Sequence, residues 1–229
     1  MLNVLIFVVN NKIRRGLQKA VPLAGLREKQ KAERERRILA AAVAQFRRVG
    51  YHAARIEDLA GAAEVSVGTV YNYHRTKGDI LIAVVAMEVE EVLAAGEAII
   101  ADPPPGVARA LLALTYQYYE HSLHYLSKEM WRAAMALSID APDTPNGRRY
   151  SELDGRLAAQ VTRLVRALAA RGEVRPRHDP VALGELLFNN LNMLFIEFVK
   201  DEAMTIAMLK DRVTRQTALV AELIAKGKG

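Results

Sequence analysis

The sequence has no cysteine, a single tryptophan and only 6% aromatic residues among its 229 positions. Without cysteine the chain cannot form a disulfide or a zinc site with thiolate ligands. It also lacks a glycine-rich phosphate loop, a G-x-S-x-G nucleophile elbow and a dinucleotide fingerprint. We therefore expect no enzyme, with no catalytic residues, no cofactor and no metal ligands. His121-x-x-His124 places two imidazoles close together, but no second ligand pair accompanies them.

Long hydrophobic runs are scarce as well. The apolar run MLNVLIFVV at the start is too short to span a membrane, which takes about 20 apolar residues. It lacks the leading positive charge and the cleavage site of a signal peptide. We expect no membrane partner, and we interpret residues 1–32 as a disordered extension or an upstream stretch included by the choice of start site. A basic arm that enters the DNA minor groove, or weak adhesion to a membrane or a partner, are the alternatives.

The positive charge is concentrated in the first third of the chain. Residues 1–77 contain 15 Lys and Arg against 6 Asp and Glu, a net charge of +9, whereas the remainder contains 17 against 20, a net charge of −3. This asymmetry is typical of a protein whose N-terminal part binds nucleic acid. The alternative is a basic domain without a polyanionic partner. The hydrophobic content of 51% suffices for a sizeable core in one or two domains.

Residues 56–77 (IEDLAGAAEVSVGTVYNYHRTK) predict two short helices joined by a tight turn. The first helix has apolar residues at helical spacing, and residues 64–66 interrupt the pattern. Ser66 is a suitable N-cap for the second helix, in which Val70 repeats the apolar spacing. Two helices joined in this way form a helix-turn-helix unit, whose second helix enters the major groove.

Residues from about 34 to 84 resemble the N-terminal DNA-binding domain of TetR-family transcriptional regulators of the TetR/AcrR type. The resemblance rests on the order of four segments: a helix with apolar residues that ends at Gly50-Tyr51, then Ile56-x-x-Leu59-Ala60, Val65-Ser66-x-Gly68-Thr69-Val70-Tyr71-x-Tyr73, and Thr76-Lys77-x-Asp79-Ile80-Leu81. It implies an all-α fold of about nine helices. A three-helix DNA-binding domain at residues 33–78 would precede a larger helical ligand-binding and dimerisation domain at residues 79–229.

The resemblance also implies a function and its partners. We expect a cytoplasmic transcriptional regulator, a repressor that binds a palindromic operator in double-stranded DNA as a homodimer. A small apolar or amphipathic inducer would release it. The alternatives are a nucleoid-associated or scaffold protein that binds DNA without a ligand, and a helical lipid- or metabolite-binding protein without DNA activity.

The expected DNA contacts follow from the matching positions. We expect Tyr71, Tyr73 and Lys77 to bind phosphates, and Thr69 with its neighbours to face base edges. The full predicted set is Arg55, Ser66, Val67, Gly68, Thr69, Tyr71, Asn72, Tyr73 and Lys77. Thr76-x-x-Asp79 predicts a capping box where the next long helix begins, a position at which a phosphate could bind the helix N-terminus.

Three residues depart from the family pattern. Arg55 replaces the usual capping Thr of the second helix, so that cap is expected to be weaker. Glu64 replaces a turn glycine and would carry a steric cost if the backbone needs positive φ. His74 replaces an aromatic residue that packs under the recognition helix, and it brings a polar tip into that space.

The remainder of the chain predicts helices at residues 77–100, 107–126, 128–139, 148–171, 181–199 and 202–225, with a loop at residues 141–147. The penultimate helix is apolar nearly all round, which is typical of a helix that is buried on more than one face. The resemblance implies that the last two helices pair with their copies in a dimer; a purely intrachain core is the alternative. The predicted ligand-binding residues, chosen as aromatic, Met and amide side chains, are Tyr116, Tyr119, Trp131, Met135, Phe188 and Asn192. Alternatively, these side chains are core packing.

Overall fold

The computed structural model describes residues 23–226, and over this range the regular structure is helical. The helices are α2 (Leu23–Val49), α3 (Ile56–Ala62), α4 (Val67–Tyr73), α5 (Lys77–Ala101), α6 (Val107–His121), α7 (Lys128–Asp140), α8 (Pro145–Ala170), α9 (Pro180–Lys200) and α10 (Ile206–Ile224). Nine helices in the described range confirm the all-α class and the expected helix number. The interpretation of residues 1–22 as an extension lies outside the described residues.

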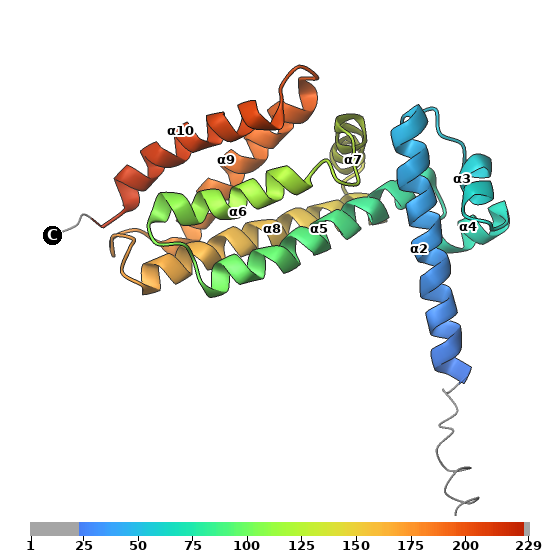
Figure 1. The fold of residues 1–229 in the computed structure, drawn as a ribbon, viewed down its shortest axis with the longest axis horizontal. Coiled ribbons are helices and arrows are strands. Elements are labelled where there is room, and N and C mark those ends of the chain that lie inside the picture. The colour runs from blue at the N-terminus through green and yellow to red at the C-terminus, as the bar shows by residue number, and fades with distance from the viewer. Residues whose placement is uncertain (1–22, 227–229) are drawn as a thin grey trace, which may run out of the picture.

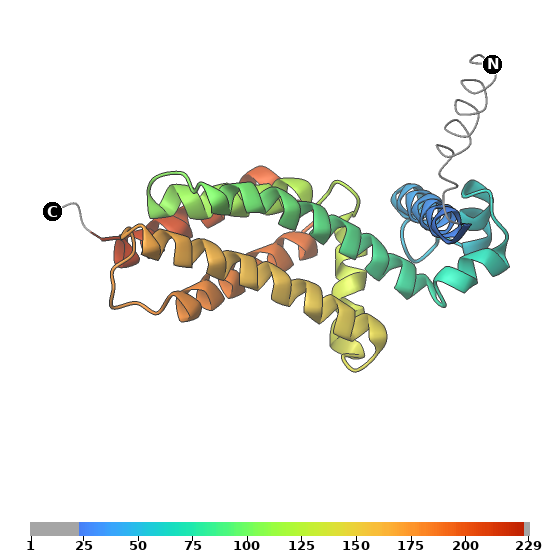
Figure 2. The same cartoon turned by 90° about the horizontal axis from the view of Figure 1, so that it is seen from below.

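The molecule has two parts joined by α5 (Figure 1). Helices α2–α4 form a small unit at one end, and α6–α10 form an elongated body with most of α5 (Figures 1 and 2). Helix α5 begins in the small unit and continues along the body, so a change of its tilt moves the two parts relative to each other.

Helix α2 begins at Leu23, earlier than predicted. The sequence predicts an extension over residues 1–32, but residues 23–32 belong to α2 in the structure. The segment LAGLREKQKAER is rich in strong helix formers, which explains its helicity without packed neighbours. Its side chains are mostly exposed, and it projects beyond α3 and α4 (Figure 1).

Few buried side chains hold the small unit together. Ile38, Phe46, Leu59 and Val70 are almost completely buried, and Leu81 of α5 joins them. The two short helices rely on their caps, because seven residues form a helix poorly on their own.

The caps agree with the prediction. The Ser66 side chain accepts a hydrogen bond from the Thr69 N–H at 3.0 Å. Thr76 and Asp79 form the expected capping box at the start of α5. Arg55 supplies no side-chain cap to α3, as its departure from the pattern suggested.

Three boundaries in the body differ from the prediction. Helix α6 ends at His121 rather than near residue 126, because the chain turns at residues 122–127 towards α7. Helix α8 begins at Pro145, within the predicted loop, because Thr144 caps it and proline suits the first helical position. Helix α10 begins at Ile206, after the Thr205 cap, rather than near residue 202.

Helix α8 is central to the body and packs against α5 and α9. Close approach to α9 depends on Gly184, because a Cβ there would lie 2.6 Å from the Thr162 Cα. Helix α9 buries a stripe of Leu183, Leu187, Leu191, Leu194 and Phe198. By length and composition it is apolar enough to cross a membrane. Its apolar character is explained by this buried stripe together with an exposed face described below.

Candidate functional site

Helix α4 exposes most of its surface at the end of the molecule away from the body (Figure 1). Of its seven residues only Val70 is buried. Tyr71 is 47% exposed, and Asn72 and Gly68 are also exposed. The Ser66 and Thr69 hydroxyl oxygens lie 2.9 Å apart. Val70 therefore packs one side of α4 against the core, and the other side exposes polar and aromatic side chains and the backbone at Gly68.

Gly68 has no packing reason to be glycine within the chain. A Cβ at this position would meet only the Ser66 Oγ, at an ordinary contact distance of 3.8 Å. Its φ lies outside the left-handed range. The free protein therefore tolerates a side chain here.

Two predicted phosphate ligands already have partners within the chain. The Tyr73 hydroxyl donates to the Lys31 carbonyl of α2 at 3.2 Å. The Lys77 ammonium donates to the His52 and Ala54 carbonyls at 2.8 and 3.2 Å, and one of its three N–H groups remains for another acceptor. Both residues thus brace the DNA-binding unit, a role that their spacing did not reveal.

The remaining departures have clear structural outcomes. Arg55 is exposed and lies 3.4 Å from the Glu57 carboxylate. Glu64 has a φ of +54°, so the turn does use the conformation that favours glycine. His74 is buried, its Nε2 has no hydrogen-bond partner, and burial lowers its pKa. It fills the space under α4 as a neutral ring.

The body contains a cavity of about 80 Å³, here called the inner cavity. Its lining comes from α5–α9 and consists of Val85, Glu88, Val89, Val92, Tyr118, Tyr119, Ser122, Trp131, Tyr150, Leu153, Asp154, Leu157, Phe188, Leu191, Asn192 and Phe195. Tyr119, Trp131, Phe188 and Asn192 of the predicted ligand set are among them.

Two members of the predicted ligand set lie elsewhere. Tyr116 points to α10, where its hydroxyl bonds Thr214 and the Lys210 ammonium lies 4.2 Å from its ring centre. Met135 lines a neighbouring outer cavity of about 410 Å³. The two cavities share Tyr150, Asp154 and Asn192, so these three residues form the wall between them. The helical spacing of Tyr116 could not show which side of α6 faces the cavity.

Aromatic rings form one wall of the inner cavity. Tyr119 and Phe195 are stacked at 6.1 Å between ring centres, and Trp131 meets Phe195 edge-on at 5.2 Å. The Tyr119 hydroxyl donates to the Leu191 carbonyl at 2.9 Å. Burial raises the pKa of Tyr118, Tyr119 and Tyr150, so all three stay neutral near pH 7.

Sequence reasoning missed the two carboxyl groups of this cavity. Glu88 is only 2% exposed, and burial raises its pKa to about 7. Burial likewise raises the pKa of Asp154 to about 6. A signal was available for both: Glu88 occurs at helical spacing from Val84, Val85 and Val92, and Asp154 follows Tyr150 by four positions.

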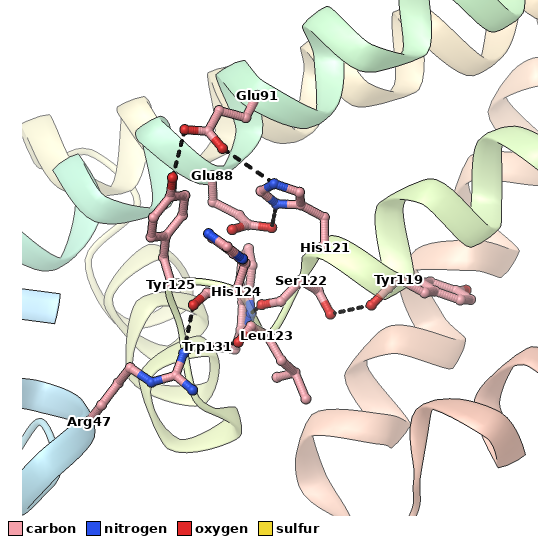
Figure 3. A network of polar contacts seen from close by, with 10 residues as sticks. All are labelled: Arg47, Glu88, Glu91, Tyr119, His121, Ser122, Leu123, His124, Tyr125 and Trp131. Atoms are coloured by element: carbon pink, nitrogen blue, oxygen red, sulfur yellow. Dashed lines mark hydrogen bonds and ion pairs between the residues drawn. The ribbon is translucent and has the colours of Figure 1, made fainter. Parts of the chain in front are cut away.

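Glu88 belongs to a polar cluster between α5 and α6 (Figure 3). His121 Nδ1 lies 2.7 Å from Glu88 Oε1, and His121 Nε2 lies 3.3 Å from Glu91 Oε2. The other carboxylate oxygen of Glu88 is buried and has no hydrogen-bond partner. Within residues 23–226, no group of three His, Asp or Glu side chains is arranged to hold a metal ion.

A short loop connects the cavity wall to the DNA-binding unit (Figure 3). The Trp131 Nε1 donates to the Ser122 carbonyl at 2.7 Å, so the indole of the cavity wall holds the start of this loop. Arg47 of α2 donates to the Leu123 and His124 carbonyls at 3.0 and 2.6 Å. Trp131, the loop and Arg47 thus form a continuous series of contacts from the cavity wall to α2.

The last two helices leave an apolar face uncovered in the monomer. Its members are the exposed side chains Leu186, Met193, Met208, Leu219 and Leu223. Exposed apolar patches on one side of a folded chain are typical of an interaction surface.

Comparison with known proteins finds a matching family. Residues 38–84 match the model of bacterial regulatory proteins of the tetR family. The HTH-type transcriptional repressor KstR of Rhodococcus jostii is 28% identical over 160 residues, which cover 68% of each chain.

Two solved structures share the fold. The transcriptional regulator FadR of Bacillus subtilis, in complex with stearoyl-CoA, matches with a TM-score of 0.60 and 18% identity over 79% of this chain and 96% of FadR. A transcriptional regulator of Saccharomonospora viridis, in complex with choline, matches with a TM-score of 0.64 and 18% identity over 86% of this chain and 100% of that one. Residues 38–84 are therefore similar to the N-terminal domain of bacterial regulatory proteins of the tetR family, and the chain as a whole has the fold of transcriptional regulators of this type.

Proposed function

We propose that this protein is a homodimeric repressor that binds a palindromic operator through α4 and leaves it when a small molecule enters the inner cavity. The main support for this proposal is a series of hydrogen bonds. They run from Trp131 of the cavity wall, through the loop after α6, to Arg47 of the DNA-binding unit. This contact supplies a physical route from ligand to DNA.

The proposed DNA contacts divide into two groups. Thr69, Val67 and the Gly68 backbone face base edges, because they occupy the start of α4, where a recognition helix approaches the groove. Tyr71, Asn72 and Arg55 are exposed enough to bind phosphates. Lys77 and Tyr73 act mainly as braces, and Lys77 adds one phosphate contact through its remaining N–H.

The proposed dimer uses the uncovered apolar face of α9 and α10. Leu186 and Met193 are seven residues apart and therefore lie on the same side of α9, and the exposed Leu219 and Leu223 lie one helical turn apart on α10. A dimer also meets the need of the operator, because one seven-residue recognition helix reads too few base pairs for tight specific binding.

The proposed ligand is a small molecule with an apolar part. FadR was solved with stearoyl-CoA and the S. viridis regulator with choline, so proteins of this fold accept ligands of different kinds. At about 80 Å³ the inner cavity is smaller than the usual ligand pocket, which has roughly 300–1,000 Å³. A ligand must therefore push its walls apart, and α5 supplies one wall.

Wall displacement explains release from DNA. Two recognition helices must lie about 34–36 Å apart to read both half-sites. A tilt of α5, together with a shift of the loop held by Trp131, changes this separation and leaves each α4 surface intact. A hundredfold loss of operator affinity requires about 2.7 kcal/mol of differential ligand binding to the two states.

The test is reciprocal titration. A ligand found by screening for operator release is titrated with and without operator DNA, and we expect its affinity to fall in the presence of operator by the same factor by which it weakens DNA binding. Equal ligand affinity in both titrations would contradict the proposal and favour a DNA-binding protein that does not respond to ligands.

The route is tested separately with Arg47→Ala. We expect this variant to bind operator, but its response to ligand should be reduced several-fold. The reason is the loss of the two hydrogen bonds from the Arg47 guanidinium to the loop. Arg48→Ala is the matched control: it removes the same charge from the same helix, yet Arg48 bonds only Gln45 of that helix. Equal responses in the two variants would exclude the Arg47 route.

A further inference from the structure

The inner cavity holds two acidic groups and no basic one. Of its sixteen lining residues, Glu88 and Asp154 are acidic, and Lys, Arg and His are absent from this lining. His121 touches Glu88 from outside the cavity and occupies one carboxylate oxygen, leaving the second, buried oxygen without a partner. A buried carboxylate oxygen without a donor is costly and is seldom retained without a reason.

Two basic side chains lie on the far side of the shared wall. Arg132 and Lys200 line the outer cavity, and Arg132 is already paired with Glu202 at 2.7 Å. The charged side chains of the inner lining are therefore acidic only, whereas the outer lining carries basic side chains as well. An anionic head would meet two carboxyl groups inside, whereas a cationic head would meet complementary charge.

We propose that the inner cavity selects a cationic amphiphile, a molecule whose protonated nitrogen binds the unpartnered buried oxygen of Glu88 and whose apolar part packs on Trp131 and Phe195. This rests on the proposed function, in which the cavity is the ligand site, and specifies its ligand class. The ammonium donates to the free oxygen of Glu88, and the carboxyl group of Asp154 in the same lining adds negative charge. The aromatic wall accepts the hydrocarbon and also favours a nearby cation.

The test uses three probes that share one hydrocarbon chain: octylamine, 1-octanol and octanoate. Trp131 is the only tryptophan of the chain and lines the cavity, so its fluorescence reports binding without a label. At pH 7.5 we expect octylamine to bind at least about tenfold more tightly than octanol, and octanoate to bind weakest, because charge-assisted hydrogen bonds are the stronger ones.

Isosteric variants assign the preference to the two carboxyl groups. We expect Glu88→Gln and Asp154→Asn each to lower octylamine affinity about tenfold while changing octanol affinity little. Asp143→Asn is the matched control, since it removes one carboxylate from an exposed loop outside the cavity. Melting curves verify that each variant is folded, and Asp154→Asn, which lies at the half-buried wall, serves if Glu88→Gln does not fold.

The outcomes separate the ligand class from the proposed function. Equal affinity for octylamine and octanol, preference for octanoate, no binding of any probe, or unchanged selectivity in both variants would overturn the cationic assignment. Operator binding is measured in the same samples. A protein that binds octylamine selectively but keeps its operator affinity contradicts the release mechanism alone. One that responds to other ligands but not to octylamine contradicts only the ligand class.

Discussion

The recognition helix and the inner cavity are built in opposite ways. Helix α4 has seven consecutive residues, of which only Val70 is buried, while Gly68, Tyr71 and Asn72 are exposed. The cavity collects sixteen residues from five helices and hides their polar groups. Under the proposed function, the α4 surface meets DNA without rearrangement, whereas the cavity has to open to accept a ligand. DNA specificity would then depend on local sequence, and the ligand response on the packing of the body.

The largest effect is expected from a substitution that destabilises the body and leaves the α4 surface intact. Gln160 is completely buried: its Nε2 donates to the Leu93 carbonyl and Glu97, and its Oε1 accepts from the Tyr118 hydroxyl at 2.6 Å. We expect Gln160→Ala to lower the free energy of unfolding by about 3 kcal/mol, because it leaves buried polar groups without partners.

Chemical denaturation and operator binding check this prediction together. Gln216→Ala is the control, since that half-buried amide makes a single bond to Asn190, and we expect a loss of about 1 kcal/mol or less. Operator affinity of the folded fraction should be unchanged in both. An equal loss of stability in the two variants would contradict the role of Gln160.

A substitution on the exposed surface of α4 should have the opposite effect: it should weaken DNA binding without destabilising the fold. We expect Gly68→Ala to raise stability by up to about 1 kcal/mol, as alanine replaces glycine in a helix without a clash. Operator affinity should fall about thirtyfold if the backbone lies against base edges, where an added methyl overpacks the interface.

Gly61→Ala is the matched control for this effect. A Cβ at Gly61 in α3 has nothing within 4 Å, so the same helical gain is expected without a loss of DNA binding. Melting curves and operator titrations of both variants are compared with the parent protein. Full operator affinity in Gly68→Ala would show that the α4 backbone does not approach the bases.

A smaller effect is expected in the dependence of stability on pH, which tests the burial of the carboxyl groups in the cavity. Burial raises the pKa of Glu88 from its ordinary value of 4.5 to about 7, so the folded protein keeps this proton when the unfolded chain has lost it. Rising pH between about 4.5 and 7 therefore favours unfolding, and the stability lost is expected to be about 1–2 kcal/mol. Asp154, whose pKa is about 6, acts in the same direction.

Melting temperatures at pH 5 and pH 8 measure this effect. Glu88→Gln should show a smaller decrease between the two pH values than the parent, because the amide does not titrate. Glu91→Gln, which removes an exposed partner of His121, should keep most of the decrease. A parent protein as stable at pH 8 as at pH 5 would contradict the burial of an acidic proton in the cavity.

The smallest effect is expected in the turn between α3 and α4. Glu64 has a φ of +54°, and Glu64→Gly relieves this strain while adding flexibility to the unfolded chain. We expect Glu64→Gly to be more stable than Glu64→Ala by about 1 kcal/mol, because alanine keeps the strain. Thermal melting of the two variants decides this; equal stability would show that the turn is not strained.

Much of the DNA-binding unit was predictable because its determinants are local. The Ser66 cap and the Thr76–Asp79 capping box depend on side chains three residues apart, and the structure confirms them. The early start of α2 was missed because its first turns have no apolar face, and helix propensity alone maintains them. The bracing bonds of Lys77 and Tyr73 were also missed, since they reach carbonyls 23 to 42 residues away.

The sequence indicated the type of side chain that lines the cavity, but not which residues meet there. The structure brings Tyr119, Trp131, Phe188 and Asn192 of the predicted ligand set to one cavity, and their contact with a ligand stays a prediction. Tyr116 and Met135 were misplaced because the 3.6-residue period shows which residues share a face, but not which neighbour that face meets. The caps and the recognition motif could be predicted because they depend on contacts within a few residues. That Glu88 and Asp154 line one apolar cavity, and that Arg47 contacts the loop beside it, depends on helix packing, which brings together residues more than 60 positions apart.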